Sequence, residues 1–95
     1  MKITITARHF DASEKLQAFV NDEIRELKKY FDGVLHAEVV LDEHAALKEV
    51  EIRINMLGKV LTSKVEGDDF YKIVPKVIDK LETQIKTAKA KAFQR

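Results

Sequence analysis

The sequence predicts an α+β fold of the order β-α-β-β-β-α, in which a four-stranded mixed sheet carries two helices packed on one of its faces. Four segments alternate apolar and polar residues with a period of two, which is typical of half-buried strands. Two longer segments place apolar residues at helical spacing. Because each strand has one apolar face, both helices should cover the same side of the sheet and leave the other side exposed to water.

The first strand is expected over residues 2–8. Ser13 suits a helix N-cap, because its hydroxyl can accept a hydrogen bond from a backbone N–H of the first turn. An apolar stripe then predicts a helix from about residue 14 to residue 31, ended at Asp32-Gly33. A helical connection of this length makes the first and second strands parallel, with a right-handed crossover.

Residues 35–42 and 49–56 alternate in the same way and predict the second and third strands. A polar connection is expected between them over residues 42–47. Leu57-Gly58-Lys59 predicts a tight turn into the fourth strand, which is expected around residues 61–65.

The last helix is expected to follow Glu66-Gly67-Asp68-Asp69, with Asp68 or Asp69 as its N-cap. Pro75 lacks the N–H for a helical hydrogen bond, so the sequence favours a short first turn that continues into the main helix. The apolar stripe of this helix comprises Phe70, Val74, Val77, Ile78, Leu81, Ile85 and Ala88.

The composition indicates one cytoplasmic domain over residues 1–95, with a mass of 10.9 kDa. Hydrophobic residues make up 45% and charged residues 35%, as in a globular chain and unlike a disordered one. The absence of cysteine excludes disulfides, thiolate metal sites and cysteine nucleophiles. No apolar run reaches the ~18 residues of a membrane span, so no membrane partner is expected.

The three histidines do not indicate a metal site. His9, His36 and His44 fall in a strand end, a strand and a loop, without the i,i+4 spacing of a helical metal-binding pair. A Gly-rich phosphate-binding motif is also absent. We therefore expect no metal and no cofactor.

Nucleophiles and acid–base pairs are equally weak candidates. Ser13 is better explained as a cap, and Ser63 shares the core-facing side of its strand. Glu49 and Glu51 share a strand face and could form a carboxylate pair, but exposed Glu is common and Arg53 offsets their charge. We expect no catalytic residue, and the protein is not expected to be an enzyme.

Charge is unevenly distributed along a chain whose net charge is only +1. Residues 70–95 carry seven basic side chains against Asp79 and Glu82, a net charge of +5. Four lysines of the last helix lie in an arc of about 120° opposite its apolar stripe and span about 20 Å, the scale of several phosphates. The four are Lys72, Lys76, Lys80 and Lys86; Lys89 and Lys91 flank them, and Arg25, Lys28 and Lys29 oppose the apolar stripe of the first helix.

Two interpretations of these lysines remain open. Exposed lysines are ordinary solubilising residues, and cations late in a helix complement its dipole. The absence of interleaved acidic residues on the arc, apart from Asp79, favours a surface for polyanions. The few aromatic residues lie at core positions or element boundaries. The protein would therefore contact RNA through its phosphates and recognise the shape of the RNA helix, without stacking on bases.

A set of motifs in a fixed order resembles a known family. The most specific are Glu66-Gly67-Asp68-Asp69-Phe70-Tyr71, Val77-Ile78-Asp79-Lys80-Leu81-Glu82 and Gln84-Ile85-Lys86, followed by Lys89 and Lys91. Supporting segments are Ile3-Thr4-Ile5-Thr6, Phe31-Asp32 and Glu38-Val39-Val40-Leu41. Over essentially its whole length the chain resembles the ribosome hibernation promoting factors and ribosome-associated inhibitors of translation, once filed as sigma-factor modulation proteins.

The resemblance implies a fold akin to double-stranded RNA-binding domains and a defined ribosomal partner. It implies binding to small-subunit rRNA in the decoding channel, which would block mRNA and tRNA and inhibit translation in stationary phase or stress. Because the chain stops at Arg95, it looks like a short form without the C-terminal dimerisation domain. We expect a monomer off the ribosome, with a separate ribosome modulation factor as a possible partner on the same ribosome.

The resemblance also implies which side chains meet rRNA. By position it implicates Lys29, Lys80, Lys86, Lys89 and Lys91, and the helical wheel adds Arg25, Lys28 and Lys76. Three departures bear on this set: Glu23 and Glu26 stand where relatives often carry Lys or Arg, Phe70 replaces the usual Met, and Pro75 interrupts a segment normally free of proline.

Two alternatives stand beside hibernation. A general double-stranded RNA-binding module would read A-form shape without preferring ribosomes. A protein-interaction domain would use the exposed sheet face of Glu49, Glu51 and Arg53, and its binding would survive ribonuclease treatment.

Overall fold

A computed structural model describes residues 2–29, 34–56 and 58–93. The elements follow the order β-α-β-β-β-α, which confirms the predicted fold class. The four strands form one sheet of order β1-β2-β3-β4, with β1 parallel to β2 and both later pairs antiparallel. Their bounds are β1 Lys2–Arg8, α1 Glu14–Arg25, a 3-10 helix Glu26–Lys29, β2 Val34–His44, β3 Leu47–Met56, β4 Lys59–Gly67 and α2 Phe70–Phe93.

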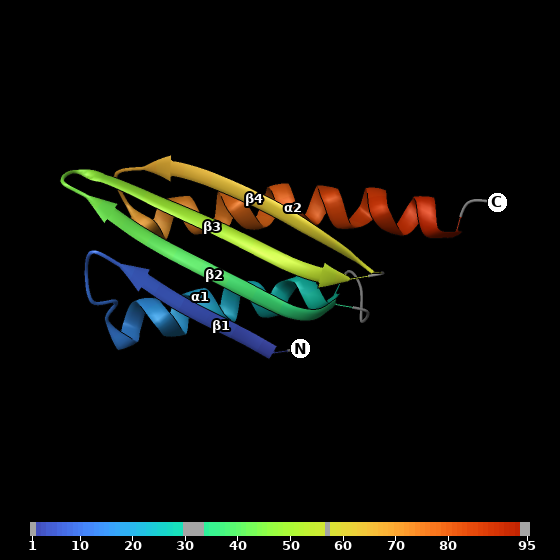
Figure 1. Ribbon diagram of the computed structural model, residues 1–95, viewed down its shortest axis with the longest axis horizontal. Coiled ribbons are helices and arrows are strands. Elements are labelled where there is room, and N and C mark those ends of the chain that lie inside the picture. The colour runs from blue at the N-terminus through green and yellow to red at the C-terminus, as the bar shows by residue number, and fades with distance from the viewer. Residues whose placement is uncertain (1, 30–33, 57, 94–95) are drawn as a thin grey trace.

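The two helices form one layer over a single face of the sheet (Figure 1). Alternation along β3 shows why: Val50, Ile52 and Ile54 are fully buried under the helices, whereas Arg53 and Asn55 are exposed. The molecule is elongated, with extents of 48 × 21 × 18 Å, and the C-terminal end of α2 projects beyond the sheet near the β3–β4 turn (Figure 1). The helices contribute to the core Leu16, Val20, Ile24, Leu27, Phe70, Ile73, Val74, Val77, Ile78, Leu81 and Ile85.

The first helix begins as the sequence predicts. The Oγ of Ser13 accepts a hydrogen bond from the Leu16 N–H at 3.1 Å, and the Gln17 N–H bonds the Ser13 carbonyl at 3.0 Å. A regular α-helix over the whole expected length does not form, because the α-helix stops at Arg25 and Glu26–Lys29 tighten into a 3-10 helix, as helix ends often do. The rest of the expected helix and its stop at Asp32-Gly33 lie outside the described residues.

The polar connection expected over residues 42–47 is wrong. β2 continues to His44 and β3 starts at Leu47, which pair directly and leave only Ala45 and Ala46 in the turn. Asp42 and His44 project from the sheet face opposite the helices, and Glu43 on the helix side pairs with Lys48 at 2.9 Å, so their polarity does not oppose strand pairing. Ala45 has a φ of 54° to close the turn.

The second hairpin and the last helix follow the sequence more closely. Gly58, at a φ of 71°, supports the tight turn that pairs Met56 with Lys59; Leu57 lies outside the described residues. Asp69 caps α2, because its Oδ1 accepts a hydrogen bond from the Tyr71 N–H at 2.9 Å.

Pro75 does not divide α2. The helix is continuous from Phe70 to Phe93, so its first turn continues into the main helix, as the sequence favours. The proline removes one N–H, whose helical partner would be the carbonyl of Tyr71 near the helix start. Burial of Ile73, Val74 and Val77 on both sides of it holds the helix together. Within the described residues no helix is long and apolar enough to cross a membrane.

Candidate nucleic-acid interface

The outward side of α2 carries a row of exposed lysines. Its opposite side packs into the core through residues such as Val77, Leu81 and Ile85, none of which is accessible to solvent. Between the first and last lysine the helix rises by about 28 Å, enough to run past several phosphates of a nucleic acid. The exposed lysines are Lys72, Lys76, Lys80, Lys86, Lys89 and Lys91.

Five of these lysines divide between the two flanks of the helix, and Lys72 points outward between the flanks. Gln84 marks the β4 flank, because its side chain bonds the Thr62 carbonyl at 3.0 Å. At 100° per residue, Lys76, Lys80 and Lys91 lie within about 80° of Gln84 and therefore on this flank.

The other flank faces α1. Tyr71 of α2 stacks at a tilt on Phe19 of α1, with ring centroids 5.0 Å apart. Lys86 and Lys89 lie within about 60° of Tyr71 on the helical wheel, so they point to the α1 side. The single lysine row of the sequence thus becomes two flanks with different neighbours.

Carboxylates offset part of the basic charge. Lys86 Nζ lies 2.9 Å from Glu82 Oε1 one turn away, and Lys29 Nζ lies 2.6 Å from Glu26 Oε2. Such exposed pairs are worth little and exchange readily for other anions. Among the described residues, no salt bridge includes Lys76 or Lys80, so the β4 flank keeps more of its positive charge.

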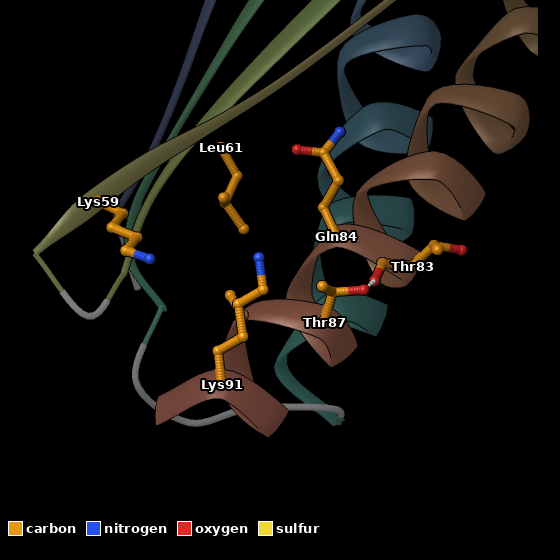
Figure 2. A pocket seen from close by; sticks show the side chains of 7 residues that line it. Lys59, Leu61, Thr83, Gln84, Thr87 and Lys91 are labelled. Carbon is orange, nitrogen blue, oxygen red and sulfur yellow. Dashed lines mark hydrogen bonds between the residues drawn. The ribbon is translucent and has the colours of Figure 1, made fainter. Parts of the chain in front are cut away.

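A groove of about 260 Å³ separates α2 from the start of β4. Lys59 reaches into it from the strand and Lys91 from the helix, so two ammonium groups face the same space (Figure 2). Sequence reasoning missed Lys59, which it used only as part of a turn; its parity with core-facing Leu61 was the available signal. The remaining lining residues are Leu61, Thr83, Gln84, Thr87 and Ala88.

The first helical segment carries the other expected cations. Arg25 is exposed in the last turn of α1, and Lys28 and Lys29 follow in the 3-10 helix. Glu26 is exposed beside them and pairs with Lys29, which lowers the local positive potential. This segment lies in the same helical layer as α2 (Figure 1).

On the opposite sheet face Arg53 pairs with Glu51, as expected, and Lys64 adds a pair with Glu49 that the sequence alone did not predict. Arg53 lies 3.3 Å from Glu51, and Lys64 lies 3.3 Å from Glu49. Ser63 is buried with 7% of its surface exposed, as the core assignment predicts. The two glutamates are therefore engaged by cations, and this geometry gives no support to an acid–base pair.

A protein-family model described as Sigma 54 modulation protein / S30EA ribosomal protein matches residues 3–92. The chain belongs to this family. The match confirms the resemblance drawn from the sequence motifs and spans every strand and nearly all of the last helix.

Three proteins similar to this chain carry names that refer to the ribosome. A ribosome hibernation promoting factor of Escherichia coli strain K12 is 29% identical over 94 residues, covering 99% of both chains. One from Acidithiobacillus ferridurans is 36% identical over 74 residues, covering 75% of this chain and 95% of the other. The structure of a ribosomal subunit interface protein from Coxiella burnetii matches with a TM-score of 0.88 at 26% identity, covering 95% of this chain and 99% of that one. The expected likeness to double-stranded RNA-binding domains stays a prediction.

Proposed function

We propose that this protein is a non-enzymatic ribosome hibernation factor. It binds the small ribosomal subunit through its rRNA in the decoding channel. There it occupies the path of mRNA and tRNA and inhibits translation in stationary phase or stress. Family membership and the printed names of the relatives support the ribosomal role.

The observation that carries the proposal is the exposed lysine surface along α2. Each ammonium group that replaces a counterion at a phosphate adds sequence-independent affinity. An elongated shape of 48 × 21 × 18 Å, with a basic helix along it, suits a channel lined with RNA. The proposed rRNA-binding residues are Arg25, Lys28, Lys29, Lys76, Lys80, Lys86, Lys89 and Lys91, to which the groove adds Lys59.

Co-sedimentation with purified small subunits tests the assigned surface. Lys76→Glu with Lys80→Glu reverses two exposed charges on the β4 flank and should abolish pelleting. The matched control is Lys2→Glu with Lys64→Glu, which changes net charge equally on the opposite sheet face and should pellet like wild type. Equal loss in both variants would assign binding to net charge alone, and unchanged pelleting of the first would exclude the α2 surface.

A second double variant tests both flanks together. Lys80→Glu with Lys86→Glu places one reversed charge on each flank and should also abolish pelleting without unfolding the domain. Circular dichroism checks the fold, because both side chains are exposed and neither contributes to the core.

Competition separates ribosome binding from general RNA binding. Excess unrelated duplex RNA should leave the protein on small subunits, whereas a general double-stranded RNA-binding module would be stripped from them. In the same preparation the bound protein should reduce tRNA and mRNA binding. We further propose that the isolated chain is monomeric and that ribosome dimers require a separate modulation factor, which sucrose gradients with and without that factor would test.

A further inference from the structure

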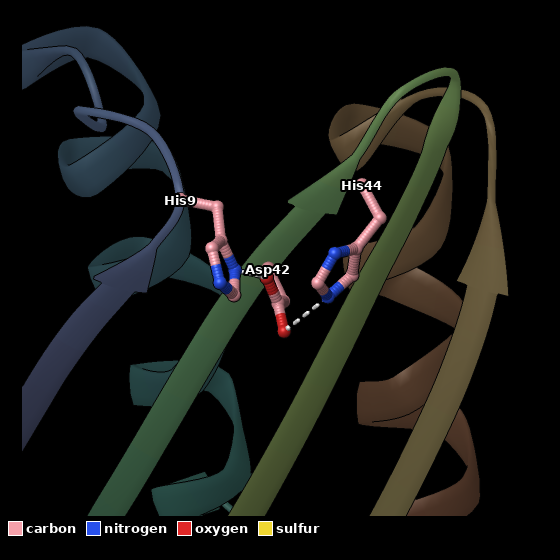
Figure 3. A group of neighbouring side chains, drawn as sticks. All are labelled: His9, Asp42 and His44. Atoms are coloured by element: carbon pink, nitrogen blue, oxygen red, sulfur yellow. Dashed lines mark hydrogen bonds and ion pairs between the residues drawn. The ribbon is translucent and has the colours of Figure 1, made fainter.

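Two imidazoles and one carboxylate meet on the exposed sheet face, away from the helices (Figure 3). His9 Nδ1 lies 2.7 Å from Asp42 Oδ1, and His44 Nε2 lies 3.1 Å from Asp42 Oδ2. The two imidazole rings are 4.5 Å apart. One ligand atom from each residue falls within 4.8 Å of the others.

Strand pairing brings these residues together. In the parallel β1–β2 register Arg8 is opposite Asp42, so His9 leaves the end of β1 directly beside that carboxylate. His44 lies two residues beyond Asp42 on the same strand, and therefore on the same face. Helical spacing could not reveal the cluster, because its members come from two strands separated by the whole of α1.

The cluster has the burial pattern of a small ligand site. The Asp42 side chain is only 10% exposed, whereas those of His9 and His44 are 59% and 61% exposed. The imidazoles thus cover the carboxylate but keep an open side to solvent.

Backbone strain gathers at the same place. His9 itself has a φ of 67°, and Ala45, next to His44, has a φ of 54°. These are the two non-glycine residues with positive φ among those the structure describes. Such conformations persist where surrounding contacts hold them, often at ligand sites.

We propose that His9, Asp42 and His44 form a binding site for a divalent transition-metal ion such as Zn²⁺. Two imidazole nitrogens and a carboxylate oxygen are a ligand set that zinc accepts, with a solvent molecule in the fourth position. Zinc–ligand bonds of about 2.0–2.2 Å place tetrahedral ligand atoms about 3.4 Å apart. The contacts of 2.7 and 3.1 Å from the imidazole nitrogens to Asp42 would widen slightly as metal bonds replace these hydrogen bonds, and all three ligand atoms already lie within 4.8 Å of one another.

The charged residues around the cluster on the same sheet face include both signs, so they do not oppose the binding of a cation. Arg8 and Glu49 are opposite Asp42 on either side of β2, and Glu66 follows in the same row on β4. Lys64 pairs with Glu49 at 3.3 Å. Imidazole ligands favour Zn²⁺, Cu²⁺, Ni²⁺ or Co²⁺ over Mg²⁺ and Ca²⁺, which prefer oxygen ligands.

Metal binding here is independent of the proposed ribosomal role. The cluster lies on the sheet face opposite the helical layer that carries the lysine surface. An ion bound to His9 would tie the end of β1 to the end of β2. Because it binds the folded state, it should stabilise the domain by mass action.

Isothermal titration of untagged, chelator-treated protein with ZnCl₂ tests the proposal. Wild type should bind one Zn²⁺ per chain. Loss of even a supporting partner of a metal ligand costs about 10–100-fold in affinity, so His44→Gln and Asp42→Asn should each lose at least about tenfold. The matched control is His36→Gln, which removes the remaining histidine; His36 contacts Thr4 at 3.1 Å elsewhere on the sheet face and should not affect binding.

A second readout keeps the test independent of folding defects. Co²⁺ added to wild type should give a visible absorption spectrum of nitrogen- and oxygen-coordinated metal, which Zn²⁺ displaces and which His9→Asn loses. Asparagine tolerates a positive φ, so this variant should keep its circular dichroism spectrum. Equal Zn²⁺ affinity in wild type and the cluster variants, or no binding by wild type, would overturn the proposal.

Discussion

Gln84 of α2 donates a hydrogen bond from its Nε2 to the backbone carbonyl of Thr62 on β4, over 3.0 Å. β4 is an edge strand, whose outward carbonyls have no partner strand. The bond therefore covers part of the edge and fixes the last helix against it. Gln84 also lines the groove into which Lys59 and Lys91 reach, so the same side chain belongs to the sheet edge and to the candidate interface.

Gln84→Met removes this bond and keeps the side-chain volume. A net contribution of about 0.5–1.5 kcal/mol is typical of such a hydrogen bond, so the free energy of unfolding should fall by about 1 kcal/mol. Urea denaturation measures it. Thr83→Ala is the control, because the Thr83 hydroxyl bonds the Asp79 carbonyl of its own helix and no other group among the described residues, so its loss should change little. Equal stability of Gln84→Met and wild type would contradict this role.

Ser13→Ala tests the cap of the first helix. The hydroxyl of Ser13 accepts the Leu16 N–H at 3.1 Å, and its loss leaves that donor without a side-chain partner. Cap substitutions of this kind cost about 1 kcal/mol. Ser13→Asp retains an acceptor and should restore most of the stability in thermal or urea unfolding. Failure of aspartate to rescue would show that the serine acts in another way.

Much of the fold could be predicted because its signals are local. The alternation of Val50, Ile52 and Ile54, the Ser13 cap and the stripe of α2 each depend on residues close in sequence. The prediction failed where polar residues were interpreted as a loop, although they belong to paired strands. Asp42, Glu43 and His44 are polar although they belong to a paired hairpin. Asp42 and His44 lie on the sheet face opposite the helices, whereas Glu43 lies on the helix side and pairs with Lys48 at 2.9 Å.

The sites depend on register, which single-residue patterns do not contain. Lys59 and Lys91 line one groove because β4 packs beside α2, and His9 contacts Asp42 because β1 is parallel to β2 in one register. A shift of one residue would turn each side chain to the other face. The lysine surface itself was predictable from helical spacing, but its division into two flanks required the position of Gln84 against β4.

Pro75→Ala tests how much the proline inside α2 lowers the stability of the protein. Alanine supplies an N–H that can bond the Tyr71 carbonyl, and proline is about 3 kcal/mol less favourable than alanine inside a helix. Pro75 is half-buried, so lost packing offsets part of this gain. The free energy of unfolding should rise by about 1 kcal/mol or more. Destabilisation would show that the proline ring contributes packing that outweighs the missing hydrogen bond.

The salt dependence of ribosome binding reports the number of phosphates that the protein neutralises. If about six are engaged, affinity for small subunits should fall by about 10³ between 50 and 200 mM salt. Filter binding or sedimentation over a salt series gives the slope. Lys76→Ala with Lys80→Ala should flatten the slope by nearly two, because each lost phosphate contact removes about 0.9. A slope near zero would exclude binding to rRNA through contacts between lysines and phosphates.

Lys59→Ala tests whether the groove belongs to the interface. Lys59 reaches into the groove opposite Lys91, so a phosphate seated there would contact both ammonium groups (Figure 2). Its removal should lower the salt slope by about one and weaken small-subunit binding at low salt. Lys64→Ala is the matched control, because Lys64 lies on the same strand but pairs with Glu49 on the opposite face. An identical slope in both variants would place the groove outside the RNA contact and confine the interface to the outward side of α2.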